Sequence, residues 1–167
     1  MHLDGLADTA DGIGAGWDRE RALRVLRTGD VGPMGVMAPG VVVLLQIASA
    51  TALLSLAHGW LLVGAAVVAS RVAATLGCLR GLPTASGSSL GAVVAGTVPG
   101  VVGGLAVVVT GAALTGATVV AGLQWWQGVA AMAALLVAVA WLLRSAVRVF
   151  GGINGDVLVA LTIGATA

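Results

Sequence analysis

The apolar stretch VMAPGVVVLLQIASATALLSLA, residues 36–57, decides the fold, because it carries no charged side chain. A helix that spans the hydrocarbon core of a bilayer needs about 20 apolar residues, and this stretch provides them. Similar apolar stretches follow at residues 60–79, 101–123 and 128–143. Residues 157–167 begin another one, which predicts part of a further span. The sequence therefore predicts an all-α, polytopic transmembrane bundle of four full spans and a partial fifth.

The composition of the whole chain agrees with this prediction. Hydrophobic residues make up 59% of the 167 residues and charged residues 9%, whereas a soluble domain carries about 25% charged residues. A soluble or disordered class is therefore excluded, and the lipid bilayer is the expected partner. Basic residues do not alternate with aromatic ones along a stripe, so no nucleic-acid partner is expected. The single cysteine, Cys78, excludes an internal disulfide.

The arginines predict the orientation of the spans. Four of them precede the first span, Arg80 follows the second, and Arg144 and Arg148 follow the fourth. Because arginine is enriched in cytoplasmic loops, residues 1–35 are expected to be a cytoplasmic region of a multi-pass cell-membrane protein, with residues 36–167 as its membrane part. This orientation requires that residues 84–100 form a loop or re-entrant segment, which the Pro99-Gly100 pair favours.

Three carboxylates near the start of the chain predict a metal site. Asp4, Asp8 and Asp11 are spaced at i, i+4 and i+7, and at 100° per residue they share one helix face. Like charges on one face repel each other, and no basic residue precedes Arg19 to offset them. Carboxylate oxygens suit Mg²⁺, which is commonly shared with substrate phosphates. We expect all three to bind Mg²⁺, with Asp8 and Asp11 as catalytic candidates; the alternative is a solvated acidic face.

A short basic amphipathic helix is predicted after this motif. Asp18 is a suitable N-cap for it, and Arg21, Arg24 and Arg27 form one stripe. Such a stripe either anchors the chain to anionic lipid or holds the phosphates of a nucleotide near the metal. Both interpretations remain open at this stage.

Two further candidates lie in the membrane part. Arg71 falls within the second predicted span, where an ionisable side chain indicates function or a buried ion pair, unless the span boundary is displaced and the side chain reaches the interface. Asn154 and Asp156 belong to the glycine-rich segment GGINGD, which the predicted topology returns to the same side as Asp4. Glycines let a backbone approach a ligand closely, although a plain turn is the simpler interpretation.

Three segments together resemble the cobalamin synthase family, the adenosylcobinamide-GDP ribazoletransferases. They are HLDGLADTADG at residues 2–12, RERALRVLRTGDVGPMGV at residues 19–36 and GGINGDVL at residues 151–158. Members usually extend further upstream, and the chain stops inside a predicted span, so we expect a chain shortened at both ends relative to the family. Asn154 and Val159 also depart from the family's usual Thr and Gly.

The resemblance implies a Mg²⁺-dependent membrane transferase. It would join α-ribazole, or its 5′-phosphate, to adenosylcobinamide-GDP and release GMP. The enzyme would work alone, as a homo-oligomer or together with other enzymes of cobalamin assembly. The candidate substrate-binding residues are Arg21, Arg24, Arg71, Asn154 and Asp156. Two alternatives remain: a CDP-alcohol phosphotransferase-like enzyme, whose D-G-x-x-A-R motif lacks its arginine here, and an inactive membrane remnant.

Overall fold

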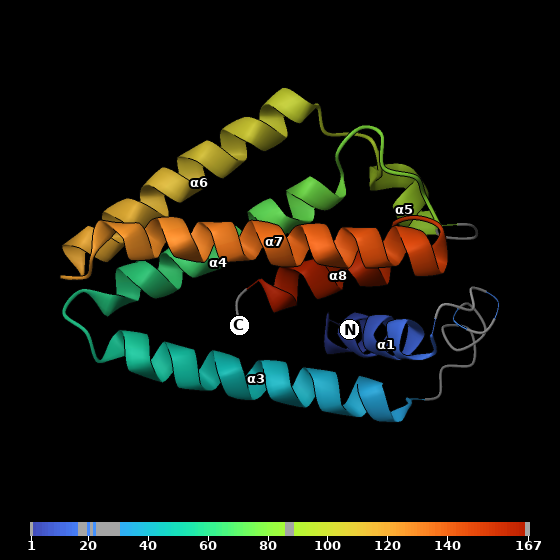
Figure 1. Ribbon diagram of the computed structural model, residues 1–167, viewed down its shortest axis with the longest axis horizontal. Helices are drawn as coiled ribbons and strands as arrows, with labels where there is room; N and C mark the ends of the chain where they lie inside the picture. The colour runs from blue at the N-terminus through green and yellow to red at the C-terminus, as the bar shows by residue number, and fades with distance from the viewer. Residues whose placement is uncertain (1, 17–19, 21, 23–30, 86–88, 166–167) are drawn as a thin grey trace.

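The structure, a computed structural model, describes residues 2–16, 20, 22, 31–85 and 89–165 of the chain. Its helices are α1 (His2–Gly14), α3 (Pro33–Leu54), α4 (Gly59–Gly77), α5 (Ser89–Val94), α6 (Gly100–Val120), α7 (Trp125–Phe150) and α8 (Gly155–Gly164). Figure 1 shows α3 and α7 running close to the long axis of the molecule, with α4 and α6 tilted against them. Within these described ranges the only β-type pairing is two isolated bridges, so the all-α prediction is confirmed.

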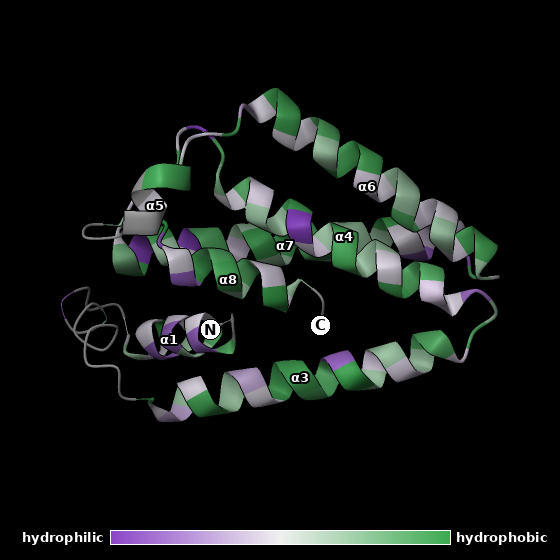
Figure 2. Ribbon diagram, turned by 180° about the vertical axis from the view of Figure 1, so that it is seen from behind, coloured by the Kyte–Doolittle hydropathy of each residue, from purple (hydrophilic) through white to green (hydrophobic). Residues whose placement is uncertain are grey.

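Four helices, α3, α4, α6 and α7, are long and apolar enough to cross a membrane, which confirms the predicted number of full spans. Many of their large apolar side chains are exposed, for example Leu44 on α3 and Val108 on α6. Figure 2 shows this as apolar ribbon along α3 and α6, with hydrophilic bands on α1. Apolar faces that point outward fit lipid, since lipid tails solvate them as well as a protein core would.

Helix α7 is longer than the sequence predicted. The expected span covered residues 128–143 and ended before Arg144, but the helix continues to Phe150 and ends at Gly151, whose φ of 78° is left-handed. The two arginines do not stop it because both are exposed, while Val149 and Phe150 on the opposite side are buried. A helix persists where its charged side chains all fall on the outer face.

The segment between α4 and α6 leaves and returns at the same end of the bundle. Two backbone hydrogen bonds close it: the Arg80 N–H donates to the Val98 carbonyl at 3.0 Å, and the Val98 N–H donates to the Cys78 carbonyl at 3.1 Å. Between these anchors the described residues contain only the short helix α5. The prediction of a loop or re-entrant segment at residues 84–100 fits this path, and α6 remains a single span.

A cluster of fully buried apolar side chains lies at the end of the bundle where α7 meets α8. Phe150, Ile153 and Val157 have no exposed surface, and Leu161 is also buried. These residues come from the last turn of α7, the connecting segment and α8. The start of a fifth span that the sequence predicted is thus the ten-residue helix α8, which packs among α1, α4 and α7.

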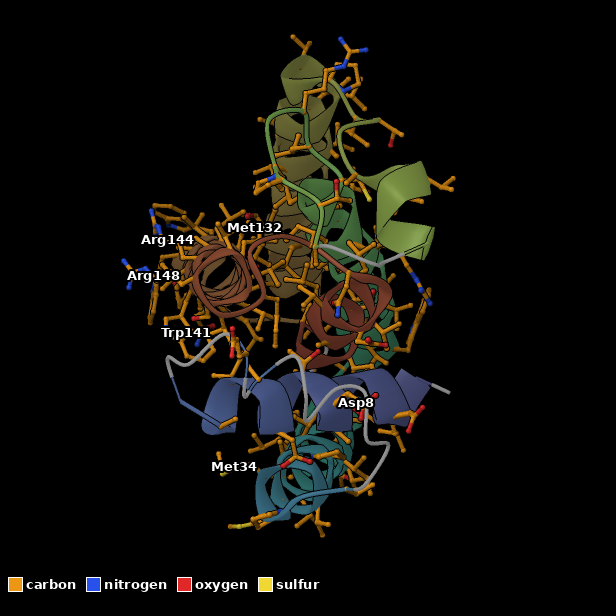
Figure 3. The ribbon with its side chains drawn as sticks, turned by 90° about the vertical axis from the view of Figure 1, so that its right-hand side faces the viewer. Asp8, Met34, Met132, Trp141, Arg144 and Arg148 are labelled. Atoms are coloured by element: carbon orange, nitrogen blue, oxygen red, sulfur yellow. The ribbon has the colours of Figure 1, made fainter. Side chains whose placement is uncertain are left out.

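Helix α1 crosses the long helices instead of running along them. Seen along the long axis, α3, α7 and α8 appear end-on in Figure 3, while α1 lies across the view between α3 and α8. Its close contacts are with these two helices. The acidic motif therefore lies across one end of the bundle, the end at which α3 and α8 begin (Figure 1).

The arrangement of the spans gives a testable topology. Helices α4 and α7 end at the same end of the bundle, and α6 and α7 are joined at the opposite end (Figure 1). Reporter domains fused after Leu82 and after Val149 should therefore be found on the same side of the membrane, and a reporter inserted at residues 124–127 on the other. Opposite sides for the first two fusions would contradict the four-span arrangement.

Candidate active site

The acidic patch, which we define as Asp4, Asp8 and Asp156, is formed where α1 touches α8. Asp4 is exposed and Asp8 half-buried on α1, and Asp156 is half-buried in the first turn of α8. The two helices meet at Gly5, where an added Cβ would lie 3.1 Å from the Asp156 Cα atom. A larger residue would push the helices apart, so Gly5 brings together carboxylates from the two ends of the sequence.

Burial and neighbouring negative charges raise the pKa values of Asp8 and Asp156. Burial is the main cause of the raised pKa of Asp8, and the negative charges of Asp4, Asp156 and Asp11 raise it further. Burial and the charge of Asp4 raise the pKa of Asp156, against a smaller lowering by its own backbone N–H. All the charges that act on these two groups within the described residues are negative. The patch is therefore a place where a cation would be stabilised.

The raised pKa of Asp8 predicts how stability depends on pH. The folded chain binds this proton more readily than the unfolded chain does, so folding loses stability as pH rises from about 4 through the raised pKa. Without divalent cations, the melting temperature of Asp8→Asn minus that of the unsubstituted chain should therefore increase as the pH is raised from 4 to 7.5. Thermal unfolding in detergent across this range measures the difference. A constant difference would show that the Asp8 pKa is not raised.

Asp11 lies on the same helix as Asp4 and Asp8 but makes different contacts. Its Oδ2 accepts a hydrogen bond from the Gly32 N–H at 2.7 Å, and its Oδ1 accepts one from the Gly35 N–H at 2.7 Å. The side chain is buried, with 7% of its surface exposed. The structure thus divides the predicted acidic face: Asp4 and Asp8 join Asp156, and Asp11 turns to the first residues of α3.

The glycine-rich segment before α8 holds Asp156 in place. The Asn154 side chain caps α8 by accepting a hydrogen bond from the Val157 N–H at 2.9 Å, and its amide donates to Asp156 Oδ2 at 3.3 Å. The segment also pairs with the loop after α4, since the Ile153 N–H donates to the Pro83 carbonyl at 2.8 Å. Asn154, a predicted substrate-binding residue, therefore has a structural task here as a helix cap.

Of the predicted arginine ligands, the structure describes Arg71. Arg71 is exposed on α4, and its charge does not contribute to the pKa shifts of Asp8 and Asp156. Figure 3 shows Arg144 and Arg148 on α7, pointing away from Asp8. Arg21 and Arg24 lie outside the described residues, so their predicted role stays a prediction.

The carboxylates of the patch fit a hard divalent cation whose coordination is completed by oxygens of a substrate. Within the described ranges, no group of three or more His, Cys, Asp or Glu residues is placed to hold a metal ion by itself. Mg²⁺ is usually bound by one or two carboxylates together with phosphate oxygens and water, and a cage of protein ligands is not required. Asp4 and Asp8, with Asp156 beside them, supply that number of carboxylates.

An apolar cavity lies between α1 and the bundle and is separate from the patch. Its volume is about 340 Å³, and its lining includes Leu6 and Ile13 of α1 and Trp141 of α7. The Thr9 hydroxyl at its edge already donates to the Gly5 carbonyl at 2.7 Å. A cavity with so little polar surface cannot solvate a charged group, so a charged ligand would not be held there.

One family of known proteins matches nearly the whole chain. The family described as Cobalamin-5-phosphate synthase matches residues 1–166. The chain belongs to this family. The sequence resemblance to the cobalamin synthases is thereby confirmed. No solved structure matches the chain.

Several curated relatives of this family member are named adenosylcobinamide-GDP ribazoletransferase. A Nocardioides relative is 41% identical over 95% of this chain and 58% of its own length. A relative from Frankia casuarinae is 40% identical over 95% of this chain and 59% of its own length. One from Pseudomonas syringae pv. syringae is 37% identical over 96% of this chain and 63% of its own length. The chain thus spans about three fifths of the length of these relatives.

Sequence reasoning missed the partners of Asp11 and the contact at Gly5. A signal for the first was present: a helix that begins Gly32-Pro33 has no side-chain acceptor at its N-cap, so its N–H groups need an acceptor from elsewhere. The sequence does not tell which residue provides it. The contact of Gly5 with Asp156 has no local signal, because it joins two helices from opposite ends of the chain.

Proposed function

We propose that this chain carries the catalytic acidic residues of an adenosylcobinamide-GDP ribazoletransferase, which joins α-ribazole or its 5′-phosphate to adenosylcobinamide-GDP. The observation that carries the proposal is the acidic patch of Asp4, Asp8 and Asp156 in a chain that matches the family over residues 1–166. A diphosphate is the part of this substrate that a cation bound by carboxylates would recognise.

The reaction is a transfer of a phosphoryl group between two oxygens. A ribazole hydroxyl oxygen forms a bond to the phosphorus that bears the cobinamide, and the bond from that phosphorus to the bridging oxygen of the diphosphate breaks. GMP leaves with that bond's electron pair. The hydroxyl proton must go to a base, and chemistry of this kind depends mainly on positioning and on charge stabilisation.

Asp8 is the best-placed base among the described residues. A general base needs a carboxylate oxygen that is free to accept the proton. Asp8 is half-buried and accepts no hydrogen bond from a backbone N–H of the described residues, whereas Asp11 has both oxygens occupied by backbone N–H groups. Asp8 would thus accept the hydroxyl proton, and Asn154 would keep Asp156 oriented beside it.

A bound Mg²⁺ would neutralise charge on the phosphate oxygens. Asp4 and Asp8 would hold it, with Asp156 as a neighbour. Arg21 and Arg24 would bind phosphate or guanosine from the cytoplasmic side of the cell membrane, where we place the acidic patch. For Arg71, exposed on α4, we propose contact with a part of the substrate remote from the diphosphate.

The test is a transfer assay in membranes that contain the chain, with the Nocardioides relative assayed in parallel. The substrates are adenosylcobinamide-GDP and α-ribazole, and both GMP and the joined product are measured. The proposal expects the two products in equal amounts, dependent on Mg²⁺ and on ribazole. Activity only with a CDP-alcohol would favour the phosphotransferase alternative. No product from the chain while the relative is active would favour an inactive remnant.

A further inference from the structure

The first residues of α3 need hydrogen-bond acceptors that α3 does not supply. The first N–H groups of any helix lack partners within the helix. Gly32, the N-cap of α3, has no side chain to accept from them, and Pro33 follows it at the first helical position. The Asp11 carboxylate supplies the acceptors from a different helix, one oxygen for Gly32 and the other for Gly35.

The fit between this carboxylate and α3 depends on the absence of side chains. A Cβ atom at Gly32 would lie 2.6 Å from Asp11 Oδ1, and one at Gly35 would overlap Asp11 Oδ2. By contrast Gly40, five residues after Gly35 in the same helix, has open space around it. The two glycines near Asp11 therefore serve the contact with α1 and are not explained by the needs of the helix itself.

These contacts leave Asp11 poorly placed to bind a cation. Each oxygen accepts a short hydrogen bond at 2.7 Å, and the carboxylate lies at the positive end of the α3 dipole. A cation would have to displace the N–H donors and enter a region of positive potential. Asp4 and Asp8 are more open and face no such donors within the described residues.

We propose that Asp11 is a positioning residue, which tethers α1 to the start of α3 and thereby holds Asp4 and Asp8 beside Asp156. It is not itself a ligand of the cation. This assignment rests on the proposed function only in taking the acidic patch as the cation site. Asp11 follows Asp8 by less than one helical turn, so the tether sets both the rotation and the position of α1 on α8.

The test uses the detergent-solubilised chain with Mn²⁺ alone as a spectroscopic probe for the divalent cation. Asp11→Asn removes one acceptor, and Gly35→Ala disrupts the same contact from the other side while every carboxylate of the chain is kept. Gly40→Ala is the matched control in the same helix. Val149→Ala, in the core on α7, is a control for general destabilisation, because Val149 is 2% exposed and lies outside the tether. Melting temperature without metal and Mn²⁺ affinity are measured for each.

We expect both tether variants to melt lower by about 5 °C and to bind Mn²⁺ roughly tenfold more weakly. The double variant should be little worse than either single one, since both break one contact. Gly40→Ala should match the unsubstituted chain in both measurements. Val149→Ala should melt lower but bind Mn²⁺ normally, which separates positioning from general stability.

Several outcomes would overturn the proposal. Weak Mn²⁺ binding by Asp11→Asn but not by Gly35→Ala would make Asp11 a ligand. Unchanged melting of both tether variants would show that no tether exists, and weak Mn²⁺ binding by Val149→Ala would remove the positioning role. If the unsubstituted chain binds no Mn²⁺, the proposed cation site fails, and the melting temperatures alone then decide for or against the tether.

Discussion

Asp8→Asn is expected to abolish ribazole transfer while the protein stays folded and inserted. Asparagine keeps the shape of aspartate but is a poor ligand for Mg²⁺ and cannot accept the hydroxyl proton. Loss of a general base alone typically costs about 10²- to 10⁴-fold in rate, and loss of the cation adds to it. The measurement is the Mg²⁺-dependent formation of the joined product, with the amount of inserted protein determined for each variant.

The stability of Asp8→Asn provides an internal check on this result. The substitution removes a charge that is repelled by Asp4, Asp156 and Asp11, so the melting temperature at pH 7 without metal should not fall. Asp18→Asn is the charge-matched control for activity, because the sequence predicts a helix cap there and asparagine caps as well as aspartate. Near-normal turnover of Asp8→Asn at every Mg²⁺ concentration would disprove the assignment of the site. So would an equal loss in Asp18→Asn.

Gly152→Ala is expected to destabilise the fold strongly, because the added methyl group would meet backbone atoms. A Cβ atom there would overlap the Thr84 backbone carbonyl carbon and lie 2.5 Å from the Ala85 backbone nitrogen. Backbone cannot move aside as the end of a side chain can, so the contact between this segment and the loop after α4 must open. We expect a loss of about 3 kcal/mol or more, above the usual range for an added methylene in a packed core.

Gly152→Ala should disturb the acidic patch as well as the loop after α4. Opening the contact breaks the hydrogen bond from Ile153 to Pro83 and frees the segment that carries Asn154 and Asp156. Thermal unfolding in detergent measures the stability, and the same Mn²⁺ titration measures the patch. Gly164→Ala in α8 is the control, since Gly164 has open space around it and alanine favours helices. Equal melting of the two variants would refute the close packing at Gly152.

The identity of the acidic residues was predictable from the sequence, but their grouping was not. The periodicity of Asp4, Asp8 and Asp11 correctly places them on a helix, α1. The structure then separates Asp11 from the other two, because its neighbours in space are Gly32 and Gly35. Helical spacing reports which side chains share a face and says nothing of which partner each part of the face meets.

What the sequence by itself determined are the features that depend on neighbouring residues. The four spans follow from runs of apolar side chains. The charge of Arg144 led to a predicted end of the fourth span that is too early, because α7 continues past Arg144 with the arginine on its exposed face. Tertiary structure alone decided that α1 lies across the bundle, that Gly5 seats it on α8 beside Asp156, and that Asp11 caps α3. The physical reason is that these contacts join helices far apart in the chain, and their geometry depends on which backbones approach closely enough to exclude a side chain.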